Sequence, residues 1–167
     1  MNDADSIVEL IPRLRRYARA LAGDRAAADD LVQDTLERAW AKLHLYRRGT
    51  DLRAWLFTVM HNVYVNQLRA ARPVAQLDED MPELSQPGRE ADGLELRDLD
   101  LAIRRLPPDQ REVLLLVVLE DMSYDEAAGA LGIPIGTVMS RLARAREKLR
   151  AMLSGLPPGG SQLKVVK

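Results

Sequence analysis

Residues 123–150 read SYDEAAGALGIPIGTVMSRLARAREKLR, and this stretch decides the fold. Ser123 followed three residues later by Glu126 is the pattern of a capping box, which starts a helix. Gly132 ends that helix, and a longer one follows. A short helix, a turn centred on glycine and a longer basic helix are the order of a helix-turn-helix, whose second helix can enter the major groove of DNA.

The longer helix has two unlike faces. At helical spacing, an apolar seam is formed by Val138, Leu142, Ala145 and Leu149. The face turned away from the seam carries Ser140, Ala143, Arg144 and Glu147. From residue 136 to 153 the helix is basic, although the chain has a net charge of −1. A basic run alone is more often a solvated bundle face, but the capped helix and turn before it favour DNA binding.

Upstream, residues 96–106 carry apolar side chains at helical spacing until Pro107 and Pro108. The next segment, 109–122, reads DQREVLLLVVLEDM, and its apolar run would also suit a buried strand. Asp109 as an N-cap and the helical surroundings favour a buried helix.

The first part of the chain predicts three more helices, so the expected fold class is all-α. Their N-caps are expected to be Ser6 together with Glu9, then Asp24, then Asp51. Pro12 is expected to kink or restart the first helix, which ends at Gly23, and Pro73 to end the third.

Between the two groups of helices lies an acidic stretch rich in proline and glycine, PVAQLDEDMPELSQPGREADG. Composition of this kind is typical of a linker. We therefore expect two small helical domains, residues 1–72 and 94–153, joined by an acidic linker over 73–93. The composition of residues 154–167 is typical of a disordered tail.

The second expected helix carries an acidic strip at helical spacing, made of Asp29, Asp30, Gln33, Asp34 and Glu37. Such a strip is usually a solvated face. Beside a DNA-binding surface it would repel phosphates, and this favours a basic protein partner.

Aromatic side chains of the first domain are interleaved with arginine and asparagine, a mixture that suits unpaired nucleic acid. Trp40 and Trp55 lie on apolar helix faces and are predicted to be core residues. His61 is interpreted as a surface polar residue. For Tyr46, Phe57 and Tyr64, stacking and core roles both remain open.

Several function classes are excluded by composition. The chain has no Cys and only two histidines, His44 and His61, so neither a disulfide framework nor a helical two-histidine metal pair is expected. We find no phosphate-binding glycine loop, activated nucleophile or carboxylate pair, and therefore expect no enzyme and no cofactor. An acidic N-terminus and the lack of a long apolar run predict a cytoplasmic protein without membrane insertion.

Four segments occur in a fixed order: DDLVQDTLERAW (29–40), DLRAWLFTVMHNVYVNQLR (51–69), LPPDQREVLLLVVLEDMSYDEAAGALG (106–132) and GTVMSRLARAREKLR (136–150). Together they resemble the extracytoplasmic-function (ECF) sigma factors of bacterial RNA polymerase, and the resemblance covers nearly everything from about residue 10 to residue 153. It implies an initiation factor whose first domain binds core polymerase and opens the minus-ten promoter element. The second domain would read the minus-thirty-five element as duplex DNA, and an anti-sigma factor would be a further partner.

The resemblance also implies site residues. Core polymerase would be bound by Asp30, Gln33, Asp34, Glu37 and Trp40. Single-stranded minus-ten DNA would meet Tyr46, Arg47, Arg48, Asn62, Asn66 and Arg69. The minus-thirty-five duplex would meet Thr137, Ser140, Arg141, Arg144 and Arg146.

Two other classes remain open. A free-standing helix-turn-helix repressor explains the second domain but gives no role to the acidic strip. A helical adaptor protein explains the acidic strip but not the basic last helix.

Overall fold

The computed structural model describes residues 2–75 and 91–154, and all regular elements in these ranges are helical, as predicted. In chain order they are α1 (Asp3–Ala22), α2 (Arg25–Ala41), the 3-10 turn η1 (Leu43–Leu45), α3 (Leu52–Ala75), α4 (Ala91–Arg105), α5 (Pro108–Leu114), the π turn η2 (Leu115–Leu119), α6 (Tyr124–Leu131) and α7 (Ile135–Leu153). Most of the predicted linker and nearly all of the tail lie outside the described residues.

Three local signals place the helices of the first half as predicted. The Asp24 carboxylate accepts from the backbone N–H of Ala27 at 3.2 Å and starts α2. The Asp51 carboxylate accepts from the N–H groups of Arg53 and Ala54 and starts α3. Gly23, with φ of 79°, ends α1 in the left-handed conformation that glycine adopts without strain.

Three boundary predictions were wrong, and a restart of the helix, one of the two outcomes expected at Pro12, does not occur. α1 begins three residues before Ser6, because the Asn2 side chain caps it, and it continues through the exposed Pro12. Packing of the apolar face of α1 offsets the hydrogen bond that proline lacks. α3 continues past Pro73 into its last turn. α5 is preceded by Pro107, so Asp109 lies in its first turn instead of capping it.

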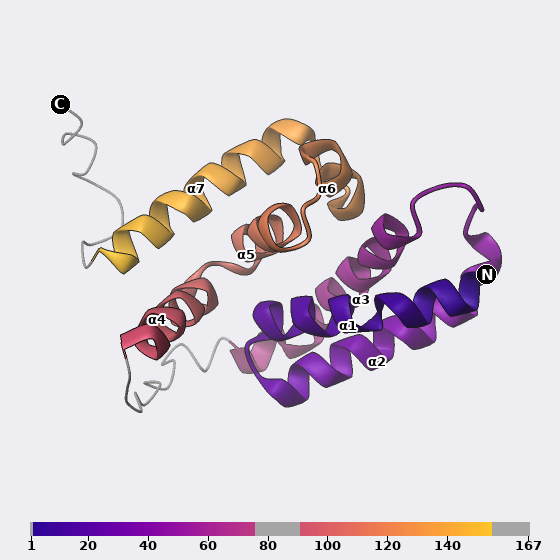
Figure 1. Cartoon of the computed structure of the whole chain (residues 1–167), viewed down its shortest axis with the longest axis horizontal. Coiled ribbons are helices and arrows are strands. Elements are labelled where there is room, and N and C mark those ends of the chain that lie inside the picture. Colours follow the sequence, from indigo (N-terminus) through magenta and orange to yellow (C-terminus); the bar gives the residue numbers. More distant parts are fainter. Residues whose placement is uncertain (1, 76–90, 155–167) are drawn as a thin grey trace.

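The first three helices enclose a core to which each contributes buried side chains (Figure 1). α1 and α2 form a helical hairpin, and α3 packs against both. The fully buried side chains of this core include Leu14 and Leu21 from α1, Leu31 from α2, and Leu56 and Met60 from α3. Burial of five such side chains favours folding by about 1.5–3 kcal/mol each.

The ambiguous apolar run 113–119 is helical, as predicted. It forms the end of α5 and the single π turn η2, and it buries Val113, Leu114, Leu115 and Leu116. α6 and α7 follow as a short helix and a long helix that meet at a sharp angle (Figure 1). α5 and α6 both pack on α7 and close the second core.

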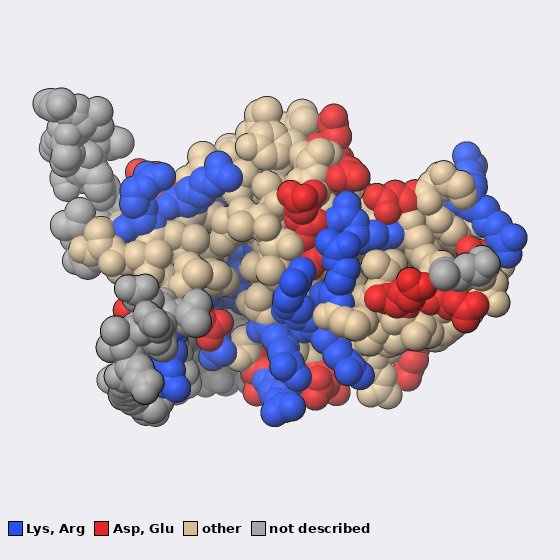
Figure 2. Space-filling view, viewed as in Figure 1, with Lys and Arg blue, Asp and Glu red and all other residues tan. Residues whose placement is uncertain are grey.

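The two halves of the molecule contact each other through α3 with α6, and through α1 with α4, α5 and η2. The carboxylate of Glu120, which is fully buried, accepts from Arg13 at 3.0 Å and from Arg16 at 3.5 Å. The backbone carbonyl of Glu120 accepts from Arg53 on α3. Arg111 donates to the carbonyl of Leu21 at 2.6 Å. In the view of Figure 2, basic side chains lie across the middle of the molecule, over α1, and acidic side chains lie beside them. Ion pairs and hydrogen bonds therefore connect the two halves.

Candidate functional site

The helix-turn-helix predicted from residues 123–150 is present. Ser123 Oγ accepts from the N–H of Glu126 at 3.0 Å, and the Glu126 carboxylate accepts from the N–H of Ser123 at 2.8 Å. Gly132 ends α6 with φ of 68°, which only glycine adopts freely. Pro134 precedes the first residue of α7. The local sequence therefore sets both the length of α6 and the start of α7.

The outer face of α7 is available for a partner. Its seam residues Val138, Leu142 and Ala145 are buried, whereas Ser140 and Arg144 on the other side are exposed. Arg146 is exposed as well. Figure 2 shows a group of basic side chains over the region of α7.

Two of the residues predicted to contact the minus-thirty-five element are less accessible to a partner than the others. Arg141 lies 3.5 Å from the carboxylate of Asp109 and is half-buried. Thr137 is half-buried in the first turn of α7, and its carbonyl accepts from the Ser140 hydroxyl at 3.2 Å. Of the three arginines in this predicted set, Arg144 and Arg146 are therefore more accessible to a partner than Arg141.

The acidic strip lies on the solvent side of α2. All of its members are exposed: Asp29, Asp30, Gln33, Asp34 and Glu37. Asp34 accepts from the side-chain amide of Gln67 on α3 at 2.9 Å, so α3 fixes the direction of this carboxylate. Sequence reasoning missed Gln67, because a contact between residues so far apart in the chain leaves no local pattern.

Trp40 is 47% exposed, so the prediction that it is a core residue was wrong. The helical spacing places it on the apolar face of α2, but it lies in the last turn of that helix. Its ring thus remains accessible to a partner at the end of the acidic strip.

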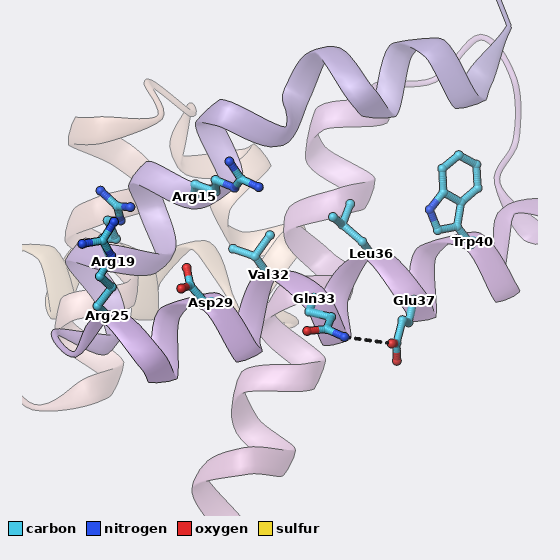
Figure 3. Close-up of a pocket in the computed structure, with 9 residues that line it drawn as sticks. All are labelled: Arg15, Arg19, Arg25, Asp29, Val32, Gln33, Leu36, Glu37 and Trp40. Atoms are coloured by element: carbon cyan, nitrogen blue, oxygen red, sulfur yellow. Dashed lines mark hydrogen bonds between the residues drawn. The ribbon is translucent and has the colours of Figure 1, made fainter.

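A groove of about 600 Å³ runs between α1 and α2 beside this strip (Figure 3). It is lined by Arg15, Arg19, Arg25, Asp29, Val32, Gln33, Leu36, Glu37 and Trp40. Arginines gather at one end, apolar side chains lie in the middle, and Trp40 stands at the other end. None of the three arginines was predicted from the sequence, because they come from two helices and meet only when α1 packs on α2.

The predicted minus-ten residues fall into two groups. Tyr46, Arg47 and Arg48 lie in the loop before α3, where the Tyr46 ring packs on Trp55 at 5.3 Å between centroids. The Tyr46 hydroxyl donates to the carbonyl of Thr50 at 2.7 Å, and Arg48 pairs with Asp3 at 3.1 Å. The ring of Tyr46 thus has a packing role in this structure.

The second group is Asn62, Asn66 and Arg69, which are exposed along α3. At 1.5 Å per residue, Arg69 lies about 26 Å along the helix from its first residue, so the loop and this end of α3 are separate surfaces. Phe57 and Tyr64 are buried, which resolves their open assignment in favour of the core. Burial raises the pKa of Tyr64 to about 12.

His61 is not a simple surface residue, so that interpretation was wrong. Its Nδ1 lies 2.7 Å from the carboxylate of Glu112 on α5, and its side chain is only 19% exposed. Burial raises the pKa of Glu112 above its ordinary range, while the hydrogen bond from His61 opposes that shift. The pair links the two halves, again between residues far apart in sequence.

In the described part of the chain, no group of three or more His, Asp and Glu side chains is placed to hold a metal ion. Among the helices in those ranges, none combines the length and hydropathy needed to span a bilayer.

Comparison with known proteins identifies both halves. The model of the sigma2 domain of PhyR matches residues 7–61, and the model of sigma-70 region 4 matches residues 96–149. Both describe domains of sigma-type proteins. The ECF RNA polymerase sigma factor EcfG of Rhodopseudomonas palustris (strain TIE-1) is 42% identical over 152 residues, which are 89% of this chain and 83% of that protein. The chain belongs to the ECF RNA polymerase sigma factors, as the resemblance predicted.

Solved structures agree in fold. The sigma factor RpoE in complex with the anti-sigma factor NepR from Bartonella quintana matches with a TM-score of 0.75 and 36% identity, over 98% of each chain. CnrH in complex with the cytosolic domain of CnrY matches with a TM-score of 0.67 and 30% identity, over 91% of this chain and 87% of that chain.

Proposed function

We propose that this protein is an alternative sigma factor that directs core RNA polymerase to specific promoters and opens the minus-ten element. It acts as a specificity subunit and carries out no catalysis of its own. The observation that carries this proposal is the pairing of two unlike surfaces in one chain of a sigma-factor family. One is the exposed acidic face of α2 and the other is the exposed basic face of α7.

The proposed domain roles follow the two groups of helices. Residues 1–72 bind core polymerase and engage the minus-ten element, and residues 94–153 engage the minus-thirty-five element. The acidic segment 73–93 connects them. No role is assigned to the tail, residues 154–167.

The proposed polymerase surface consists of Asp30, Gln33, Asp34, Glu37 and Trp40. Their accessibility supports this assignment, because carboxylates in a row complement a basic partner surface and speed its association. An accessible tryptophan at the end of that row suits an anchor residue, since tryptophan is enriched among the side chains that dominate binding energy.

The proposed promoter contacts are split between the domains. The unpaired minus-ten strand is held by Tyr46, Arg47, Arg48, Asn62, Asn66 and Arg69. The minus-thirty-five duplex is met by Thr137, Ser140, Arg141, Arg144 and Arg146. A chain with net charge −1 offers little non-specific attraction to phosphates, so most promoter affinity depends on the polymerase partner.

An anti-sigma factor is proposed as a second partner. The support is that the similar sigma factor RpoE of Bartonella quintana was solved in complex with the anti-sigma factor NepR, and that the similar protein CnrH was solved in complex with the cytosolic domain of CnrY.

Run-off transcription with purified core polymerase and genomic promoter fragments tests the function. We expect promoter-dependent transcripts with the wild-type chain and few or none with Asp34→Arg, because reversing a charge at the interface creates repulsion. Glu9→Arg makes the same charge change at an exposed site on α1 and should keep activity. Tight, sequence-specific promoter binding by the free chain, without transcription when core is added, would instead support a repressor.

A further inference from the structure

Met139 on α7 is a large apolar side chain that faces solvent. It is 48% exposed, whereas Val138 before it and Leu142 three residues after it are buried. As the fifth residue of α7, it lies in the first two turns of the second helix of the helix-turn-helix. The N-terminal turns of that helix are the part that contacts base edges in domains of this class. An apolar side chain therefore occupies a position suited to base contact.

The surface around Met139 is open. Helical spacing places Gly136, three residues before it, and Ala143, four residues after it, on the same strip of α7. Apart from its chain neighbours and the backbone of its own helix, no heavy atom lies within 4 Å of the point where Gly136 would carry a Cβ. Ala143 is exposed and has only a methyl group as its side chain. Met139 is thus the one long side chain on this strip, and neither neighbour screens it from a ligand.

The charges near the strip favour DNA. Arg144 is exposed, and its guanidinium group attracts phosphates. Glu147, the only acid of α7, is half-buried and lies about 12 Å further along the helix than Met139, at 1.5 Å per residue. The carboxylate of Asp109 on α5 is paired with Arg141 at 3.5 Å. A phosphate backbone can therefore approach the first turns of α7.

The exposed apolar area is too small for a protein interface. Ile135, which is 40% exposed, is the only other large apolar side chain that is exposed in the first two turns of α7. A protein interface of standard size buries about 800 Å² on each partner, which is several times what two side chains supply. A contact with a single base needs far less area.

The chemistry of a thioether selects among the bases. In the major groove, thymine alone presents an apolar group, its C5-methyl, whereas the other bases present hydrogen-bond donors and acceptors. The sulfur of Met139 donates no hydrogen bond and is only a weak acceptor. Packing it on a polar base edge would remove those groups from water without replacing their hydrogen bonds, which is costly. Met139 is therefore suited to thymine.

We propose that Met139 packs against the C5-methyl group of a thymine in the minus-thirty-five element and thereby selects a T·A pair at one position. The inference rests on the proposed function, since it requires α7 to lie in the major groove. It adds an apolar, specificity-determining contact to the polar contacts proposed for Ser140 and Arg144.

Replacement of thymine by deoxyuridine tests this contact, because it removes the C5-methyl group and leaves base pairing intact. Holoenzyme assembled from core polymerase and this chain is titrated onto a labelled promoter duplex found by run-off transcription, and each thymine of the minus-thirty-five element is replaced in turn. We expect one position at which the wild type binds the deoxyuridine duplex about fourfold more weakly, the effect of losing one buried methyl group. Met139→Ala should bind the thymine and deoxyuridine duplexes with equal affinity.

Two variants serve as controls. Met139→Leu keeps an apolar side chain of similar volume and should keep the preference for thymine. Leu153→Ala removes an exposed apolar side chain from the last turn of α7, about 21 Å from Met139 along the helix, and should keep the preference as well. Circular dichroism verifies that each variant is folded.

The outcomes separate this inference from the proposed function. If every thymine can be replaced without effect, or if Met139→Ala keeps the wild-type preference, the inference is overturned, while promoter-dependent transcription leaves the proposed function standing. A minus-thirty-five element without any A·T pair would overturn it in the same way. Loss of affinity for core polymerase by Met139→Ala in the absence of DNA would show that the strip binds protein instead. A holoenzyme with no preference for any promoter would overturn both proposals.

Discussion

At the scale of single residues, the adjacent residues His61 and Asn62 of α3 have different surroundings. His61 points to the second half of the molecule and binds Glu112. Asn62, the next residue, is exposed, and within the described residues its amide has no hydrogen-bond partner. A free carboxamide can bind either a donor or an acceptor on a base edge. Asn62 is therefore suited to hold a base that has left the duplex.

We predict that Asn62→Ala impairs promoter opening more than promoter binding. Extruding a base costs a few kcal/mol, which contacts to the freed strand must offset. Because Asn62 supports no other side chain, the fold should change by less than about 0.5 kcal/mol. Permanganate footprinting of unpaired thymines should show reduced opening on duplex templates and partial rescue on a template already unpaired at the minus-ten element. Wild-type opening on the duplex would exclude Asn62 from this role.

At the scale of helices, the sequence predicted those boundaries that depend on near neighbours. Ser123 with Glu126, Asp24 and Asp51 all cap helices as expected, because the bonded groups lie within three residues of each other. Ser6 and Asp109 do not cap their helices, because the N-caps are Asn2 and Pro107, four and two residues earlier.

Positions that depend on other helices were not predictable in the same way. The exposure of Trp40 depends on whether another element covers the last turn of α2. Asp34 with Gln67, His61 with Glu112 and the groove arginines depend on which helices pack side by side. The exposed face of α7 could therefore be predicted from the sequence, whereas the groove between α1 and α2 could not.

The capping box of α6 gives a prediction at this scale. Ser123→Ala removes the oxygen that accepts from the Glu126 N–H, and we expect a loss of about 1 kcal/mol in the free energy of unfolding. Ser140→Ala is the control, because that hydroxyl is exposed and bonds only within α7. It should change stability by less than about 0.5 kcal/mol. Urea unfolding followed by circular dichroism measures both, and equal midpoints for the two variants would refute the capping contribution.

At the scale of the whole molecule, the described structure is closed, with the second half packed on α1 and α3 (Figure 1). On the proposed function, its two DNA surfaces serve promoter elements whose names place them about 25 base pairs, or about 85 Å, apart. A compact chain of 167 residues has a radius of gyration of only about 15 Å. The closed form therefore cannot reach both elements, and the halves must separate when promoter is bound.

Closure should depend on the arginines around Glu120. Removing both Arg13 and Arg16 would leave a fully buried carboxylate without its two side-chain counter-charges, which costs on the order of 3–5 kcal/mol if the halves stay together. We therefore predict that Arg13→Ala/Arg16→Ala opens the free protein. Because the chain has no cysteine, Ala26→Cys and Arg150→Cys provide unique sites for spin labels. Double electron–electron resonance should show one short distance population in the parent and a broader, longer one in the variant. The matched pair Arg15→Ala/Arg19→Ala, on the same helix but without ion pairs in the described structure, should keep the parent distribution. An unchanged distribution in Arg13→Ala/Arg16→Ala would show that the apolar contacts alone hold the halves together.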